Sequence, residues 1–384
     1  MPRPSHPKPH LPMPVYFDNA ATTFPKPKSV RSAAAKAVSE AGGNPGRGSH
    51  ILAKRAGDIV YHARETAAGF FGAEPEHVVF TLNCTHALNL AIWGILRNGG
   101  HAVISSLEHN SVYRPIAALA RSRIITYNIA QVSSDNAQTL ANFRRLLRPD
   151  TRAVICSLVS NVTGQILPVR ELAAICAERG IALIADGAQG CGILPVRLSD
   201  GINILCTAGH KGLYGLMGSG MLITDGTYPL IPLMQGGTGS FSMSAKQPHF
   251  LPDALEAGTV AVPAIAALDA GIRFIAQQGI SKIYSHESML CERLIQGLRR
   301  MPDIIVYREA DAEYAPVVSF CRTDETPADT AERLAAQGFC VRAGLHCAPL
   351  AHNTLGTSEN GTVRFAPSVF STIEETDAFL RAVR

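Results

Sequence analysis

A succession of short apolar runs, separated by helix-like segments, constrains this fold more than any other feature. The runs cover residues 78–81, 101–105, 124–127, 153–157, 181–185, 202–206 and 221–224. Helical patterns cover residues 87–96 and 170–179 between them. Short apolar strands that alternate with helices predict an α/β protein with a mainly parallel sheet, covered by helices on both faces.

The second half of the chain predicts a separate, smaller unit. A stretch rich in Gly, Ser and Pro at 235–252 interrupts the alternation, and an alanine-rich helix begins near Pro263. Strand-like runs at 316–320 and 362–366 and a terminal helix at 374–383 follow. We therefore expect a flexible arm at 1–14, a large domain at 15–262 and a small α+β domain at 263–384. The large domain starts with a strand-like run at 15–18, and about its first 15 residues are expected to pack with the small domain.

Composition excludes several classes of protein. The chain of 384 residues is 46% hydrophobic, which suits a globular protein, and its net charge of +4 is too small and diffuse to predict nucleic-acid binding. No run of about 18 apolar residues lacks a charge, so we expect no membrane span.

The nine cysteines form no C-x-x-C pair, and several lie in apolar runs. This pattern predicts free thiols in a reducing compartment, with neither a disulfide framework nor a metal site. The first residues lack an apolar signal-peptide core, so we expect a cytoplasmic location.

Polar side chains follow five of the apolar runs, where a parallel sheet binds its ligands. They occur at 83–86, 108–110, 160–161, 186–189 and 207–211. The sequence therefore predicts one crevice at the carboxyl edge of the sheet.

Four residues of this crevice suit a phosphorylated, cationic aromatic aldehyde. Lys211 is the only lysine between positions 54 and 246, and Asp186 is suited to pair with a ring nitrogen. Thr85 lies where a helix begins and would bind phosphate, and the flat ring of His109 could stack on the cofactor. Taken singly, Asp186 could be a turn residue, Thr85 a helix cap and His109 a surface or core histidine. The prediction depends on their joint occurrence.

Six motifs carry a resemblance to a known family. They are Tyr16-Phe-Asp-Asn-Ala-Ala-Thr22, Asn161-Val-Thr-Gly164, Ala185-Asp-Gly-Ala-Gln189, Gly209-His-Lys211, Glu256-Ala-Gly-Thr259 and Arg342-Ala-Gly-Leu-His-Cys347. In order and spacing they resemble the class V aminotransferase-like cysteine desulfurases, and most closely the group II enzymes and selenocysteine lyases.

The resemblance implies a homodimer of the pyridoxal-phosphate-dependent fold type I, with a seven-stranded sheet in the large domain. Lys211 would carry the cofactor, His109 would stack on its ring and assist proton transfer, and Asp186 would pair with its ring nitrogen. The remaining implied contacts are Gln189 and Asn161 on the ring hydroxyl side, and Thr85, the His86 backbone, His210 and the other subunit's Thr259 on the phosphate. Arg364, assisted by Arg342, Asn161 and Ala20, would bind the substrate.

Cys347 is implied to be the sulfur-carrying residue. It lies in a polar, glycine-containing loop beside His346 and near Arg342, neighbours that favour a thiolate. By resemblance, L-cysteine would become L-alanine, and the sulfur would pass as a Cys347 persulfide to a separate acceptor protein. A cysteine in a loop is otherwise usually inert.

The motifs depart from the family pattern at four positions: His86, Leu158, Ala208 and Ala261. Within the enzymes, a carbon–sulfur lyase, a selenocysteine lyase and an aminotransferase stay open as alternatives. A non-catalytic scaffold in sulfur transfer is a further alternative.

Overall fold

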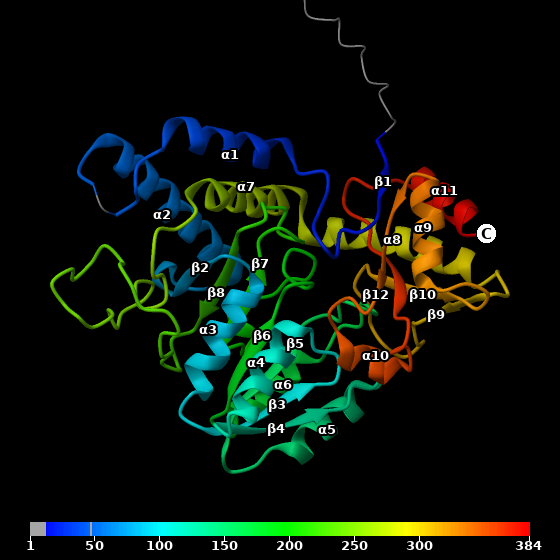
Figure 1. The fold of residues 1–384 in the computed structure, drawn as a ribbon, viewed down its shortest axis with the longest axis horizontal. Coiled ribbons are helices and arrows are strands. Elements are labelled where there is room, and N and C mark those ends of the chain that lie inside the picture. Colours follow the sequence, from blue (N-terminus) through cyan, green and yellow to red (C-terminus); the bar gives the residue numbers. More distant parts are fainter. Residues whose placement is uncertain (1–12, 47) are drawn as a thin grey trace, which may run out of the picture.

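The computed structural model describes residues 13–46 and 48–384, so residues 1–12 of the predicted arm lie outside the described residues. Within that part, the central sheet has seven strands in the order β2-β8-β7-β6-β5-β3-β4 (Figure 1). Their bounds are β2 Val78–Thr81, β3 Gly100–Ser105, β4 Ile125–Ala130, β5 Thr151–Ser157, β6 Ala182–Asp186, β7 Ile204–Ala208 and β8 Gly220–Thr224.

The prediction of a mainly parallel sheet is confirmed. Strands β3 to β7 pair in parallel, and only β8 runs antiparallel to its neighbours β2 and β7. The run predicted at 202–206 differs from its predicted bounds, because β7 begins at Ile204 and continues to Ala208. This extension follows from pairing, since Thr207 and Ala208 lie opposite Met221 and Gly220 of β8.

Helices cover both faces of this sheet. Side chains alternate between the faces, so Ala153 and Ile155 of β5 join one apolar core while Val154 and Cys156 join the other. Helices α3 (Cys84–Leu96) and α4 (Asn110–Arg121) pack on the first face. The second face is covered by α2 Ile51–Phe71, α5 Asn136–Leu146, α6 Val169–Ala177 and α7 Val262–Gln278. Helix α1 (Lys28–Glu40) lies alongside α7 (Figure 1).

A smaller antiparallel sheet follows α7 in the chain, with the order β12-β13-β10-β9. The elements that follow α7 in the chain are α8 Ile280–Leu298, β9 Ile304–Val306, β10 Val318–Arg322, α9 Pro327–Ala336, β11 Phe339–Cys340, β12 Arg342–Gly344, α10 Pro349–Leu355, β13 Thr362–Phe365 and α11 Ile373–Val383. Phe17, Phe320, Phe365 and Phe379 form an aromatic cluster in its core. The N-terminal segment thus contributes a core residue to this part of the fold.

The segment 16–26, here called the N-terminal strap, runs from this smaller sheet to the large one. Strand β1 (Val15–Tyr16) pairs in parallel with β11, and Asp18 forms an isolated bridge to Ala366 just after β13. The predicted strand at 15–18 is therefore shorter than expected. Beyond Tyr16 the backbone forms single hydrogen bonds to Cys340 and to Ala366, and it then turns toward the loop that follows β7.

Glu256, the acidic residue of the motif Glu256-Ala-Gly-Thr259, forms a buried ion pair with Arg64. Its carboxylate accepts hydrogen bonds from Arg64 Nη1 and Nη2 at 2.8 and 2.9 Å, and from the Phe80 backbone at 2.6 Å. Glu256 therefore fixes the loop before α7 against strand β2. In the described part of the chain, no helix combines the length and apolar character needed to cross a bilayer.

A second buried carboxyl group, Glu287 of α8, lies behind the loop that follows β7. Tyr214 Oη donates a hydrogen bond to Glu287 Oε1 at 3.3 Å and accepts one from the Val369 backbone at 3.1 Å. Burial raises the pKa of Glu287 to about 8. The side chain is therefore protonated in the folded protein at neutral pH.

Glu287 makes the stability of the protein depend on pH. As pH rises from about 4.5 to about 8, the unfolded chain releases a proton that the folded chain retains, so the free energy of unfolding falls. We expect Glu287→Gln to gain stability relative to the wild type over this range, by up to about 1.4 kcal/mol per pH unit. Urea denaturation at about pH 6 and about pH 8 measures the difference.

The matched control is Glu292→Gln, which changes a more exposed glutamate on the same helix. A stability difference between Glu287→Gln and the wild type that stays constant with pH would contradict the prediction.

Candidate active site

A cavity of about 90 Å³ lies at the carboxyl edge of the central sheet. Its lining includes seven of the predicted residues: Thr85, His109, Asn161, Asp186, Gln189, His210 and Lys211. The parallel register explains this convergence, because Ser157, Asp186 and Cys206 lie side by side at the ends of β5, β6 and β7. The prediction of one crevice therefore agrees with the geometry.

Asp186 is a buried carboxyl group with one oxygen already bonded. Its Oδ1 accepts hydrogen bonds from the Ala188 backbone at 2.9 Å and from Cys84 Sγ at 3.4 Å. Burial raises the pKa of Asp186, and the Ala188 bond and the nearby Lys211 oppose that shift. The Oδ2 atom stays available for a cationic ring nitrogen, which would stabilise the ionised form.

Lys211 follows β7 and lines the same cavity. Burial lowers the pKa of its ammonium group, whereas Asp186 acts in the opposite direction. A lowered lysine pKa increases the fraction of neutral amine, which is the nucleophilic form. The environment of Lys211 therefore suits an amine that reacts with a carbonyl group.

His109 is held as a neutral imidazole of defined tautomer. It caps helix α4, and its Nδ1 accepts a hydrogen bond from the Ser111 backbone at 3.0 Å. Nδ1 therefore carries no proton, and the proton lies on Nε2. Burial, assisted by the nearby Lys211, lowers the pKa of His109 to about 4. A neutral, half-buried ring at this position suits stacking on a flat cofactor.

The start of helix α3 lines the cavity through Asn83, Cys84 and Thr85. Asn83, and not Thr85, caps this helix, because Asn83 Oδ1 accepts the His86 N–H at 2.9 Å. The His86 N–H predicted to bind phosphate is thus already donated to the cap. The Thr85 hydroxyl instead lies 2.7 Å from Ser111 Oγ. The alternative of Thr85 as a helix cap is therefore excluded.

Two imidazole nitrogens are buried without partners in the described structure: Nδ1 of His210, which follows β7, and Nε2 of His86, on helix α3. Burial lowers the pKa of His210 to about 4, so its ring is neutral near pH 7. Buried unpartnered polar atoms are costly, and they indicate where a ligand would bind.

Asn161 and Gln189 line the cavity, but their amide groups donate elsewhere. Asn161 Nδ2 donates to the His346 carbonyl at 2.9 Å, and Gln189 Nε2 donates to the Ala20 carbonyl at 2.9 Å. Their predicted contacts with the ring hydroxyl stay predictions.

The Cys347 loop is bonded to the cavity wall. The Asn110 backbone, next to His109, donates to the Cys347 carbonyl at 2.7 Å, and Asn161 holds the preceding carbonyl. His346 and Cys347 both adopt left-handed backbone conformations, with φ of 47° and 56°. Such conformations are strained for residues with a side chain, so these two bonds stabilise an unusual turn.

His346 supplies no positive charge to Cys347, contrary to expectation. Its Nε2 donates to the Thr362 carbonyl at 3.0 Å, and burial lowers its pKa to about 2. The imidazole is therefore neutral, and its role at the loop is structural. Arg342, which is exposed on β12, is the cationic neighbour that remains.

Arg364 lies on β13 outside the cavity lining and is only 2% exposed. Its Nη1 donates to the Asn161 carbonyl at 3.0 Å, and its Nη2 pairs with Asp18 Oδ1 at 2.9 Å. The guanidinium is therefore connected to the cavity through Asn161. The implied contact between Arg364 and the substrate stays a prediction.

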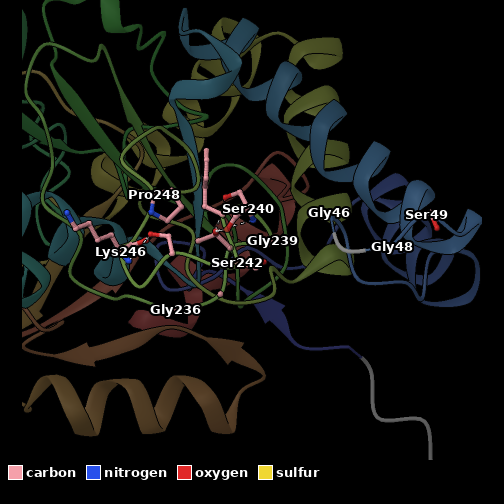
Figure 2. A pocket seen from close by; sticks show the side chains of 13 residues that line it. Gly46, Gly48, Ser49, Gly236, Gly239, Ser240, Ser242, Lys246 and Pro248 are labelled. Carbon is pink, nitrogen blue, oxygen red and sulfur yellow. Dashed lines mark hydrogen bonds between the residues drawn. The ribbon is translucent and has the colours of Figure 1, made fainter.

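Thr259 does not line the cavity of its own chain, and its hydroxyl accepts a hydrogen bond from Asn44 Nδ2 at 3.3 Å. Near that surface, a hollow of about 800 Å³ lies between the segment around Gly46 and residues 236–248 (Figure 2). Glycine and serine dominate its lining, and Lys246 is its charged member. It contains none of the predicted site residues, so its chemistry does not suggest a second reaction centre.

The four departures from the family pattern have different surroundings. Ala208 lines the cavity, whereas His86 lies in the first turn of helix α3 and is not among the lining residues. Leu158 is buried in the apolar core, close to Gly190, where a histidine would have to be desolvated. Ala261 begins α7 without a side-chain cap.

Sequence reasoning assigned no role to several residues that shape the site, notably Cys84, Ser111 and Glu108. Glu108 is fully buried and accepts hydrogen bonds from Ser105 Oγ at 2.5 Å and from the Ser157 backbone and hydroxyl at 2.8 Å. Burial raises its pKa to about 7. Its position directly before His109 is the feature of the sequence that could have identified Glu108 as part of the site.

The solvent exposure of the cysteines predicts that one thiol, that of Cys347, is the most reactive. Cys347 is exposed and Cys340 is partly buried, whereas the other cysteines are buried. Burial raises the pKa of Cys176 and Cys191 to about 12, and it also raises the pKa of Cys84, Cys156 and Cys206 well above the usual value of a thiol. We expect iodoacetamide to modify Cys347 first in the native protein, as mass spectrometry of peptides would show. Cys347→Ser should abolish this fast labelling, and fast labelling of a buried cysteine would contradict the assignment.

The comparisons with known proteins agree with this geometry. The family model "Aminotransferase class-V" matches residues 15–379. A probable cysteine desulfurase of Methanothermobacter thermautotrophicus is 32% identical over 94% of this chain and 92% of its own length. A probable cysteine desulfurase of Mycolicibacterium paratuberculosis is also 32% identical over 96% of this chain, but the chain spans only 55% of that relative's length.

Among solved structures, the apo cysteine desulfurase of Thermococcus onnurineus NA1 superposes with a TM-score of 0.89 at 30% identity. The match covers 96% of this chain and 93% of the other. Sequence and fold thus agree along nearly the whole described chain, and the chain belongs to the class-V aminotransferase family.

Proposed function

We propose that this protein is a pyridoxal-phosphate-dependent cysteine desulfurase that converts L-cysteine to L-alanine and carries the sulfur on Cys347. One observation carries the proposal. A lysine with a lowered pKa and a buried aspartate share one cavity, and the exposed Cys347 loop is hydrogen-bonded to the wall of that cavity. The relatives named cysteine desulfurase support the choice of reaction.

The residues of the cavity fit the cofactor. Asp186 Oδ2 suits a ring nitrogen, the neutral His109 ring suits stacking, and Lys211 suits the aldehyde. The unpartnered Nδ1 of His210, which lines the cavity, suits the phosphate, as does the N-terminus of helix α3. Pyridoxal phosphate, when bound, supplies an electron sink conjugated to the α-carbon of the substrate.

Each side chain then has a defined task. Arg364 binds the substrate's carboxylate, and Lys211 Nζ accepts the proton of the α-carbon, because its lowered pKa keeps more of the amine neutral at neutral pH. His109 Nε2 carries the proton that it can donate during the reaction, since Ser111 occupies Nδ1.

Cys347 performs the sulfur transfer. Its thiolate sulfur forms a bond with the sulfur of L-cysteine, and the carbon–sulfur bond of the substrate breaks. The bonding electrons stay with the carbon skeleton, which gains a proton and leaves as L-alanine. The transferred sulfur is oxidised to the persulfide level and the carbon is reduced, so no other oxidant is needed. A thiol acceptor protein then takes the sulfur from the exposed Cys347.

We propose further that the protein is a homodimer in which Thr259 serves the phosphate site of the neighbouring copy. Its exposure and its distance from the lining of its own cavity support this assignment. The nine unpaired cysteines support a reducing, cytoplasmic location.

Replacing Cys347 tests the proposed reaction. Cys347→Ala should retain the absorbance of the bound cofactor but lose sulfide release from L-cysteine by roughly 100-fold or more, since the sulfur has no nucleophile to accept it. After brief exposure to L-cysteine, the wild type should gain about 32 Da on the peptide that contains Cys347.

The matched control is Cys340→Ala, which changes another cysteine of the same smaller sheet region and should release sulfide at the wild-type rate. Unchanged sulfide release by Cys347→Ala would contradict the persulfide step. Pyruvate and ammonia as products would indicate a lyase, and a requirement for a 2-oxo acid would indicate an aminotransferase.

A further inference from the structure

The Asp18–Arg364 ion pair joins two residues that are 346 positions apart in the chain. Arg364 is 2% exposed at its side chain and Asp18 is 20% exposed. A second hydrogen bond connects Arg364 Nη1 to the Asn161 carbonyl at 3.0 Å. Two acceptors therefore fix the plane of the guanidinium before any substrate arrives.

Asp18 is itself held firmly by backbone bonds to the strand region that carries Arg364. The Ala366 N–H donates to the Phe17 carbonyl at 2.7 Å, and the Asn19 N–H donates to the Ala366 carbonyl at 3.2 Å. Tyr16 Oη donates to the Asp18 carbonyl at 3.2 Å. Phe17 and Asn19 are the neighbours of Asp18 in the chain, and their backbone hydrogen bonds to Ala366 therefore hold the Asp18 carboxylate in position.

The other end of the N-terminal strap holds the backbone next to Lys211. The His210 carbonyl accepts hydrogen bonds from the Thr23 backbone at 3.0 Å, Thr22 Oγ1 at 3.1 Å and Lys26 Nζ at 2.9 Å. One short segment therefore bonds both to the arginine proposed to bind the substrate and to the lysine proposed to carry the cofactor. The N-terminal strap therefore helps to fix the positions of Arg364 and Lys211 relative to each other.

Arg364 retains donors for a ligand after these bonds are made. A guanidinium has five N–H groups, and Asp18 and Asn161 accept only from Nη2 and Nη1. Arg364 Nε is buried and has no partner in the described structure. An unpartnered buried donor on a cation is costly, and a carboxylate would satisfy it.

We propose that Asp18 is a positioning residue that orients the Arg364 guanidinium to receive the substrate's carboxylate. The inference deepens the proposed function and rests on it. Asp18 acts through Arg364 and not on the substrate directly. Its removal should therefore weaken the binding of ligands that have a carboxylate, and leave the binding of a matched amine unchanged.

The test compares L-alanine with ethylamine, which is L-alanine without its carboxylate. Both amines are titrated into the holoenzyme and followed by the absorbance of the bound cofactor. The variants are Asp18→Asn, which removes the charge at constant size, and Asp18→Glu, which keeps the charge but displaces it. The matched control is Asp377→Asn on α11, which breaks a more exposed arginine–carboxylate pair with Arg293 of α8.

We expect Asp18→Asn to raise the dissociation constant of L-alanine about tenfold, the loss typical of a misoriented charge-assisted hydrogen bond. Asp18→Glu should lie between Asp18→Asn and the wild type, and Asp377→Asn should equal the wild type. The dissociation constant of ethylamine should stay constant in all variants, because this ligand has no carboxylate.

Equal weakening of both ligands, or unchanged L-alanine binding in Asp18→Asn, would overturn the assignment of Asp18 and leave the proposed function standing. If Asp18→Asn does not fold, Asp18→Glu alone decides, since selective weakening of L-alanine supports the assignment and any other pattern opposes it. A wild-type holoenzyme whose absorbance responds to neither ligand would overturn the proposed function, and this inference with it.

Discussion

The parallel register of β5, β6 and β7 is the constraint on which the rest of the site depends. It brings Ser157 and Asp186 next to each other, and the backbone bond from Leu158 to the Asp186 carbonyl continues this alignment beyond the strands. Water is largely excluded at this edge, so the charge of Asp186 needs a cationic partner. Lys211 is one such cation, because its charge acts to lower the pKa of Asp186.

Much of the remaining site is built by connections between distant parts of the chain. The N-terminal strap bonds to the region of β13 and to the loop after β7, and the Cys347 loop bonds to Asn110 and Asn161. Asn161 also accepts a hydrogen bond from Arg364, so the groups proposed to bind the substrate's carboxylate and to receive its sulfur meet at one residue. The groups proposed for substrate binding and for sulfur transfer therefore share a common structural support.

The sequence alone predicted the sheet and its crevice because both depend on local patterns. Apolar runs mark the strands, and polar residues such as Asp186 and Lys211 follow them directly. The Asp18–Arg364 pair could not be predicted in this way, because no spacing rule relates residues that meet only after both sheets have formed. The charge state of His346 also escaped prediction, since it depends on burial under a loop whose left-handed turn has no glycine to indicate it. At helix α3, the sequence left Thr85 open as a cap, whereas the structure shows that Asn83 caps the helix, which depends on where the helical backbone begins.

The left-handed turn at His346 and Cys347 has an energetic consequence for opening the loop. Each non-glycine residue in this conformation costs roughly 1–2 kcal/mol, which the bonds from Asn110 and Asn161 must offset. Detaching the loop breaks two hydrogen bonds but also releases this stored strain. The free energy needed to detach the loop and move Cys347 is therefore smaller than the loss of its two hydrogen bonds alone would imply.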